Sequence, residues 1–265
     1  MPAITWNDLG ERYFETGVDR GVLYPVGGEG IPWNGLISVK ETPSGGDATP
    51  YYLDGIKYAN RPAVEEFEGT IEAYTYPDEF ALCDGTEAIP NAQGLFATQQ
   101  ARSKFGLSYR TQIGNDTEGP SHGYKLHLIY NALAEPTEKS YSSESEEVDP
   151  STFSWKFTTT PIPIPGITYS AHMVIDTRKA WPWAVEAVEN VLYGTEDTPS
   201  RLPTPQEVMD LFIENALLKV TDNGDGTVTI SGPDEAIYLW TTGQYKINWP
   251  SVVINDVNSF NISPL

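Results

Sequence analysis

Cysteine, histidine and positive charge are scarce in this sequence of 265 residues. Cys83 is the one cysteine, so no disulfide can form within the chain, which fits folding in a reducing cytoplasm. Lysine and arginine number 16 against 37 aspartates and glutamates, which gives a formal net charge of -21. Because nucleic acids and anionic membranes are polyanions, this charge excludes electrostatic attraction to either of them.

Long apolar runs are missing as well. No segment approaches the roughly 18 apolar residues that a membrane-spanning helix needs. Residues 1–10 contain no basic patch followed by an apolar core, which a signal peptide requires. We therefore expect no membrane anchoring and folding in a cytosol.

Residue patterns typical of catalysis are also absent. There is no glycine-rich phosphate loop, and His122, His127 and His172 have no partner at metal-ligand spacing. His127 and His172 fall in predicted strands, where packing is their expected role. Glu65 and Glu66 are consecutive strand residues that point to opposite faces, so they cannot form a glycosidase pair. We predict no catalytic residue, no metal and no cofactor, and hence a protein that is not an enzyme.

One acidic segment, residues 222–227, superficially matches a calcium loop. Such a loop needs a glutamate at its twelfth position, and that position is Pro233 here. The segment reads Asp-Asn-Gly-Asp-Gly-Thr and lies between two short apolar runs, so it predicts a hairpin turn.

Glycine, proline and aromatic residues are frequent and scattered. Short aromatic-rich segments separated by turns are typical of an all-β architecture, and a chain of this length can bury a substantial core. The predicted strands cover residues 33–40, 64–74, 106–113, 124–131, 152–160, 167–176, 236–240, 245–248 and 251–254.

Two helices are predicted among these strands. In the first, residues 183–193, Val185, Val188 and Leu192 are spaced by three and four residues, as on one face of a helix. The second covers residues 205–215. It follows Thr204, begins with a proline and has a glutamate at its third position, which is a capped start.

Two segments without clear periodicity indicate contacts outside the subunit. Residues 1–32 are interrupted by glycines and are predicted to form an extended N-terminal arm, with a disordered terminus as the alternative. Residues 41–62 form a loop that is long for a compact domain. A free loop would leave its large apolar side chains in water, so we predict that it packs on a neighbouring subunit. These side chains are Tyr51, Tyr52, Leu53, Ile56 and Tyr58.

The predicted strand 64–74 carries an acidic face. Period 2 places Glu66, Glu68 and Glu72 on one side, together with Thr70. Adjacent carboxylates cannot be buried together cheaply, so this side must be open to water. It is either a solvated sheet face or the acidic lining of a pore.

Five stretches carry a family resemblance. They are residues 72–80 (EAYTYPDEF), 104–111 (KFGLSYRT), 124–130 (YKLHLIY), 153–161 (FSWKFTTTP), and 192–194 (LYG) with 203–208 (PTPQEV). Together they resemble the major tail tube proteins of long-tailed bacteriophages with non-contractile, siphovirus-type tails. The resemblance spans most of the chain and is one of overall pattern.

The resemblance implies a mainly β fold, a β-sandwich or β-barrel-like core with a flanking helix, over residues 1–195. Six such subunits form a ring with a continuous inner barrel, and rings stack through the long loop, here 41–62, and through terminal arms. The lumen is acidic, which favours Glu66, Glu68 and Glu72 as lining residues. Residues 196–265 then form a C-terminal extension, either a small β module or an arm.

The same resemblance implies partners and a location. The tube assembles in the host cytoplasm around a tape-measure protein, ends in terminator and tip proteins, and becomes part of the virion. During genome ejection DNA passes through it without specific binding.

A glycan-binding β-sandwich is the alternative interpretation. Tryptophans can stack on sugar rings when they are exposed. Candidates are Trp6, Trp33, Trp181 and Trp249.

Overall fold

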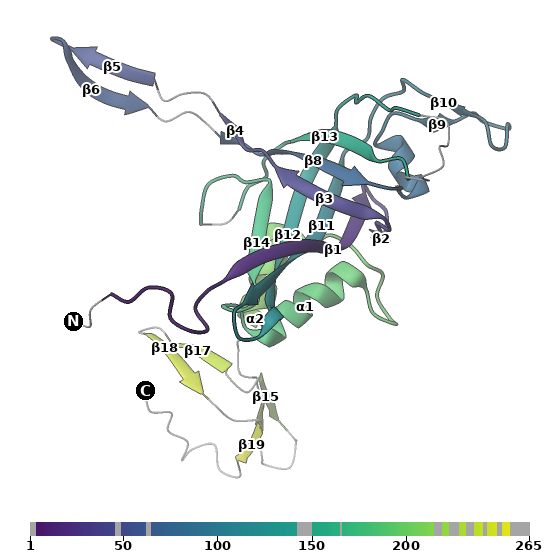
Figure 1. The fold of residues 1–265 in the computed structure, drawn as a ribbon. Coiled ribbons are helices and arrows are strands. Elements are labelled where there is room, and N and C mark those ends of the chain that lie inside the picture. The colour runs from purple at the N-terminus through teal and green to yellow at the C-terminus, as the bar shows by residue number, and fades with distance from the viewer. Residues whose placement is uncertain are drawn as a thin grey trace.

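The computed structural model has a mainly β fold, as the sequence predicts (Figure 1). It describes residues 4–45, 49–61, 65–141, 150–164 and 166–214, and the strand segments 219–222, 228–231, 236–240, 243–247 and 251–254.

An antiparallel sheet of eight strands forms the body. The strand order is β2-β1-β11-β12-β13-β8-β3. The eighth strand, β14, is not part of this order and pairs with β12. The strands are β1 (Phe14–Pro25), β2 (Ile31–Pro32), β3 (Leu36–Glu41), β8 (Glu68–Ala73), β11 (Phe105–Asn115), β12 (Gly119–Ala134), β13 (Phe153–Thr159) and β14 (His172–Asp176).

The sheet folds over on itself because β12 belongs to two layers. Lys125 to Ile129 pair with β14, whereas Ala132 to Ala134 pair with β13. Asn131 lies between these pairings with a φ of 51°, a left-handed conformation that asparagine tolerates better than most residues. As a result β13, β8 and β3 cross over β1, β11, β12 and β14 as a second layer of a β-sandwich (Figure 1).

The first core fills the space between the two layers. Trp155 and Phe157 of β13 enter it from one layer, and Leu107 and Tyr109 of β11 enter it from the other. Trp155 makes edge contacts with Trp33 and Phe80 at ring-centroid distances of 6.0 and 5.2 Å. Such aromatic pairs stabilise a core beyond the area that they bury.

The layer formed by β1, β11, β12 and β14 is called the lower layer below. The second core lies on its other face, away from the first core. Helix α1 (Pro182–Tyr193) and helix α2 (Pro205–Glu214) cover this face. Leu126 and Leu128 of β12 point to the helices, whereas Ile129 points into the first core. Successive side chains of β12 therefore enter the two cores in turn, so both faces of this strand are buried.

Both helices confirm the sequence prediction. Val188 and Leu192 of α1 are fully buried. At the start of α2, the backbone N–H of Glu207 donates to Thr204 Oγ1 over 3.3 Å, and the Thr204 N–H donates to Glu207 Oε2 over 2.8 Å. This reciprocal pair is a capping box.

The N-terminal arm is shorter than predicted. The prediction placed it over residues 1–32, but Phe14–Pro25 form β1, which pairs with β11 in the body. Register shifts occur around Gly17 and Arg20, whose φ values are 65° and 46°. Each bulge shifts the alternation by one residue, so the strand has no continuous period of 2 in the sequence.

Short elements complete the described structure. Their bounds are β4 (Ser44–Gly45), β5 (Thr49–Leu53), β6 (Ile56–Arg61), β7 (Glu65–Glu66), the 3-10 helix η1 (Asp78–Leu82), β9 (Glu87–Ala88), β10 (Phe96–Ala97), β15 (Lys219–Asp222), β16 (Val228–Ser231), β17 (Ala236–Trp240), β18 (Gly243–Ile247) and β19 (Ser251–Ile254).

The C-terminal strands agree closely with the sequence prediction. β17 and β19 have the predicted bounds, and Asp222 of β15 pairs with Val228 of β16, as a hairpin requires. The predicted extension starts at residue 196, but Val208, Leu211 and Phe212 of α2 pack in the second core. Residues through Glu214 therefore belong to the body.

Candidate functional site

The segment predicted as a stacking loop forms a β-hairpin. β5 and β6 pair in antiparallel fashion around Asp54 and Gly55, whose φ values are 50° and 77°. Two consecutive residues with positive φ between paired strands make the tight turn that Asp-Gly favours. The Asp-Gly pair between two apolar runs was the sequence signal for this hairpin, and the loop prediction overlooked it.

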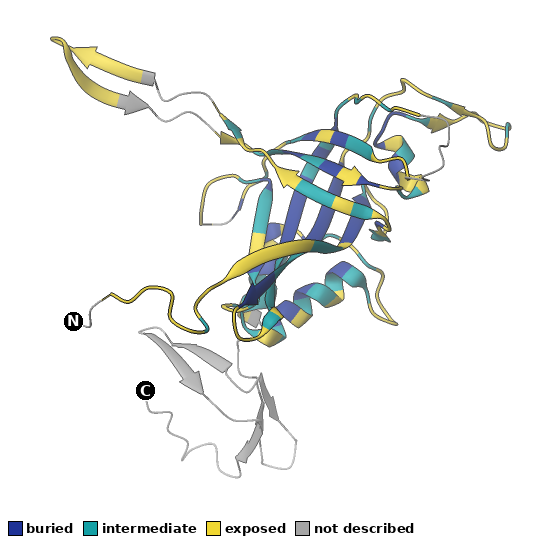
Figure 2. Ribbon diagram, viewed as in Figure 1, coloured by how far each residue is buried: buried dark blue, intermediate teal, exposed yellow. Residues whose placement is uncertain are grey.

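The hairpin projects away from the body, at the upper left of Figure 1. All five predicted contact residues are at least half exposed, from 50% for Tyr51 to 77% for Tyr58. Figure 2 shows the contrast with the central strands, which are largely buried. β5 and β6 form a two-stranded sheet of their own, and within the described residues their five apolar side chains are exposed to water.

The predicted acidic strand is divided in two. Glu66 lies in β7, which pairs with β4 at the base of the hairpin, whereas Glu68 and Glu72 lie in β8. Within β8 the alternation is as predicted. Ile71 and Ala73 face the first core and are fully buried, and Glu72 is exposed on the outer face.

Lysines share this outer face. Lys40 of β3 and Lys156 of β13 lie opposite Thr70 on either side of β8, so their side chains are on the side of Glu68 and Glu72. Lys156 Nζ is 3.3 Å from Glu68 Oε2. A hydrogen bond from Ser44 and this pairing lower the pKa of Glu68. The face is therefore polar and of mixed charge, with Glu66 and Glu72 as its more exposed carboxylates.

A cluster that sequence reasoning missed lies between the two layers. Glu41, the last residue of β3, approaches His127 of β12, with Oε1 3.2 Å from Nδ1. His172 of β14 places Nε2 3.1 Å from the same Nδ1 and 3.9 Å from Glu41 Oε1. The three residues come from strands far apart in the sequence, so no local spacing could indicate their contact.

Hydrogen bonds and burial set the charges in this cluster. The hydrogen bond from His127 is the main cause that lowers the pKa of Glu41 to about 2, and Tyr109 contributes a second one from its hydroxyl over 2.7 Å. Burial lowers the pKa of His172 to about 4. Near neutral pH the cluster therefore contains a carboxylate next to a neutral His172 imidazole.

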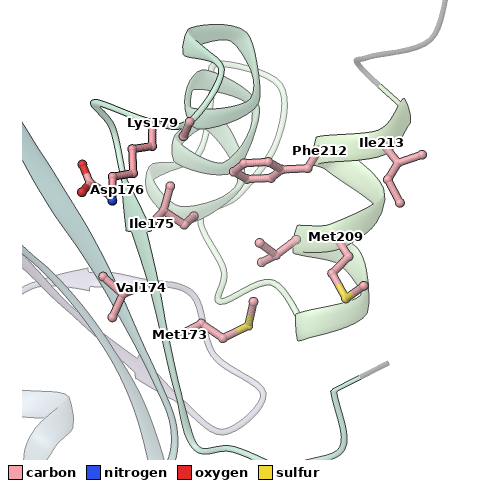
Figure 3. A pocket seen from close by; sticks show the side chains of 10 residues that line it. Met173, Val174, Ile175, Asp176, Lys179, Met209, Phe212 and Ile213 are labelled. Carbon is pink, nitrogen blue, oxygen red and sulfur yellow. The ribbon is translucent and has the colours of Figure 1, made fainter. Parts of the chain in front are cut away.

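An apolar groove of about 500 Å³ lies between β14 and α2 (Figure 3). Met173 and Ile175 line it from the strand, and Met209 and Phe212 line it from the helix. Asp176 stands at its edge, where it pairs with the Arg178 guanidinium over 2.9 Å. The lining is mainly apolar, with Asp176 and Lys179 as its charged residues.

The tryptophans proposed for glycan stacking lie in different environments where the structure describes them. Trp6 is 77% exposed, but Trp33 is 3% exposed and packs in the first core. Trp181 precedes α1 and stacks on Trp183 at 6.4 Å. Trp249 lies outside the described residues.

Comparisons with known proteins leave the family open. No protein-family model matches the chain, and no curated protein matches its sequence. A chain in a solved structure titled "Cryo-EM structure of the anti-feeding prophage (AFP) baseplate, 6-fold symmetrised" is similar with 9% sequence identity and a TM-score of 0.31. The similarity covers 66% of this chain and 96% of that one, and a likeness this low carries no weight for fold or function. Among the described residues, no helix has both the length and the apolar character to cross a membrane.

Proposed function

We propose that this protein is a structural virion subunit, the major tail tube protein of a long-tailed phage. Six copies form a ring, and stacked rings form the conduit through which DNA passes during ejection. The observation that carries the proposal is the projecting β5–β6 hairpin. It holds large apolar side chains in water, and such a surface is suited to burial against another molecule.

Repeated contact between identical subunits accounts for this surface. A heterologous contact that closes by rotation makes a ring, and the same chain can extend along the axis by a second contact. Sheet edges supply candidate joints within the ring. Among the described strands, β3 ends the strand order of the body and β14 pairs with β12 alone. The hairpin supplies the contact between rings.

Glu66 of β7 and Glu68 and Glu72 of β8 remain our candidates for the lumen. Carboxylates there would repel DNA phosphates, which favours passage without binding, and physiological salt limits this repulsion to roughly 8 Å. Lys40 and Lys156 reduce the net negative charge of the outer face of β8. The proposed partners are further copies of the chain, a tape-measure protein, and terminator and tip proteins.

Removal of the hairpin tests this proposal. Gly45 of β4 lies directly opposite Glu65 of β7, so an Asn-Gly turn in place of residues 46–64 would close the base as a short hairpin. We expect a folded monomer that no longer assembles, as measured by sedimentation and electron microscopy. If this variant forms tubes as readily as the parent protein, the hairpin is not the contact between rings.

A further inference from the structure

We propose that Glu41, His127 and His172 bind one Zn²⁺ ion between the two layers of the sandwich. These three side chains bring their donor atoms together within one subunit, whether or not it assembles into a tube.

The donor atoms are spaced for a single metal ion. The separations among Glu41 Oε1, His127 Nδ1 and His172 Nε2 are 3.2, 3.1 and 3.9 Å. Three atoms with these separations lie on a circle of about 2.0 Å radius, so one point lies at the usual zinc–ligand distance from all three. Little rearrangement is needed to bring a metal into bonding range.

The donor types select the metal. Two imidazole nitrogens favour zinc and related transition metals over Mg²⁺ and Ca²⁺, which prefer oxygen ligands. Two histidines and one glutamate also form the protein ligand set of known zinc sites that leave one position open. Here the open position would be taken by water, because His172 lines a cavity of about 730 Å³ beside Glu65 and Tyr169.

Neighbouring groups hold each ligand in place. The Tyr109 hydroxyl donates to Glu41 Oε1, and its ring stacks on the His127 ring at 4.5 Å with an interplanar angle of 6°. Thr111 Oγ1 is 3.1 Å from His127 Nε2. Metal binding would displace the Nδ1 proton that bonds Glu41, and Nε2–H would then donate to Thr111 Oγ1, which orients the ring. Phe67 packs on the His172 ring at 4.4 Å.

Zinc at this point would link strands that the backbone connects only indirectly. Glu41 ends β3, immediately before the segment that leads to the projecting hairpin, whereas His127 and His172 belong to the lower layer. A bound ion would therefore fix the base of the hairpin to the main sheet.

Calorimetry on the full chain tests the site. The protein is prepared without an affinity tag, stripped with a chelator, and titrated with ZnCl₂ alone. We expect one Zn²⁺ per chain with a dissociation constant of about 1 μM or tighter. Glu41→Gln and His172→Gln should each weaken binding at least tenfold, and Tyr109→Phe should weaken it about tenfold through loss of the bond to Glu41.

His122→Gln is the matched control. His122 also faces a carboxylate, with Nδ1 2.8 Å from Glu118 Oε2, but among the described residues no third His, Cys, Asp or Glu completes a metal-binding group with that pair. Zinc binding should survive this change, and circular dichroism should show that every variant is folded. Absence of stoichiometric zinc, or equal binding by the parent protein, Glu41→Gln and His172→Gln, would overturn the proposal and leave a hydrogen-bonded cluster only.

Discussion

The body and the β5–β6 hairpin place aromatic side chains in opposite environments. In the body, Trp155 and Tyr109 are at most 1% exposed and contact other rings. In the hairpin, Tyr52 and Tyr58 are 66% and 77% exposed. Apolar surface is stabilising only when it is removed from water, so the body gains its stability within one chain. In the proposed assembly, the hairpin residues gain theirs by burial against a second copy of the chain.

This comparison separates substitutions that unfold the protein from those that affect its assembly. Changes in the body should lower the free energy of unfolding. Changes in the hairpin should leave it almost unaltered. The following predictions run from the largest expected change in that free energy to the smallest.

Truncation of Trp155 should have the largest effect. Trp155→Ala leaves a cavity in the first core and should cost about 3–5 kcal/mol in urea unfolding. Trp155→Phe is the control. It keeps an aromatic ring and removes an indole N–H that finds no acceptor among the described residues, so it should cost much less. Equal costs for both variants would mean that ring packing does not determine the stability of this core.

Loss of the cap on α2, a helix that packs in the second core, should lower the free energy of unfolding by a smaller amount. Thr204→Ala removes the hydroxyl that accepts from the Glu207 N–H and should cost about 1 kcal/mol in thermal or urea unfolding. Thr204→Ser retains a hydroxyl and should remain close to the parent protein. If Thr204→Ser is as unstable as Thr204→Ala, the cap does not explain the loss.

Acid should weaken the body through Asp19. The hydrogen bond from Arg110 is the main cause that lowers the pKa of Asp19 from its ordinary value of 3.8. The ionised form is therefore favoured by folding, and its contribution is present above about pH 4 and lost as the pH falls through the lowered pKa. Between pH 5 and 2, the unfolding free energy should fall more steeply for the parent protein than for Asp19→Asn. Parallel curves would contradict this assignment.

Substitution of exposed tyrosines should have the smallest effect on stability. Tyr52→Ser with Tyr58→Ser should change the unfolding free energy by less than about 0.5 kcal/mol, because both residues are exposed. The same variant should fail to assemble in sedimentation experiments. Tyr169→Ser, at a residue that is 71% exposed outside the hairpin, is the control and should assemble. If the double variant assembles, these hairpin tyrosines are not required for tube formation.

Local signals explain how much of the fold could be predicted. Thr204, Pro205 and Glu207 mark the start of α2 within a few residues, and the alternation through Leu126 and Leu128 marks β12 as a strand. In contrast, β1 was hidden by bulges at Gly17 and Arg20, which break the period that identifies a strand.

The site residues show the same dependence on local information. The contact role of the hairpin side chains stays a prediction, and the two strands that carry them were not predicted. The lysines that flank β8 come from β3 and β13, and their placement depends on the strand order. His127 and His172 meet because β12 pairs with β14, and Glu41 reaches them because the sheet folds over at Asn131, so their contact could not be predicted from spacing.

Negative-stain electron microscopy of the purified protein at high concentration tests the central claim most directly. The account predicts six-fold rings or hollow tubes, formed alone or once tape-measure and tip proteins are added. Particles that stay monomeric even with those proteins present would contradict it.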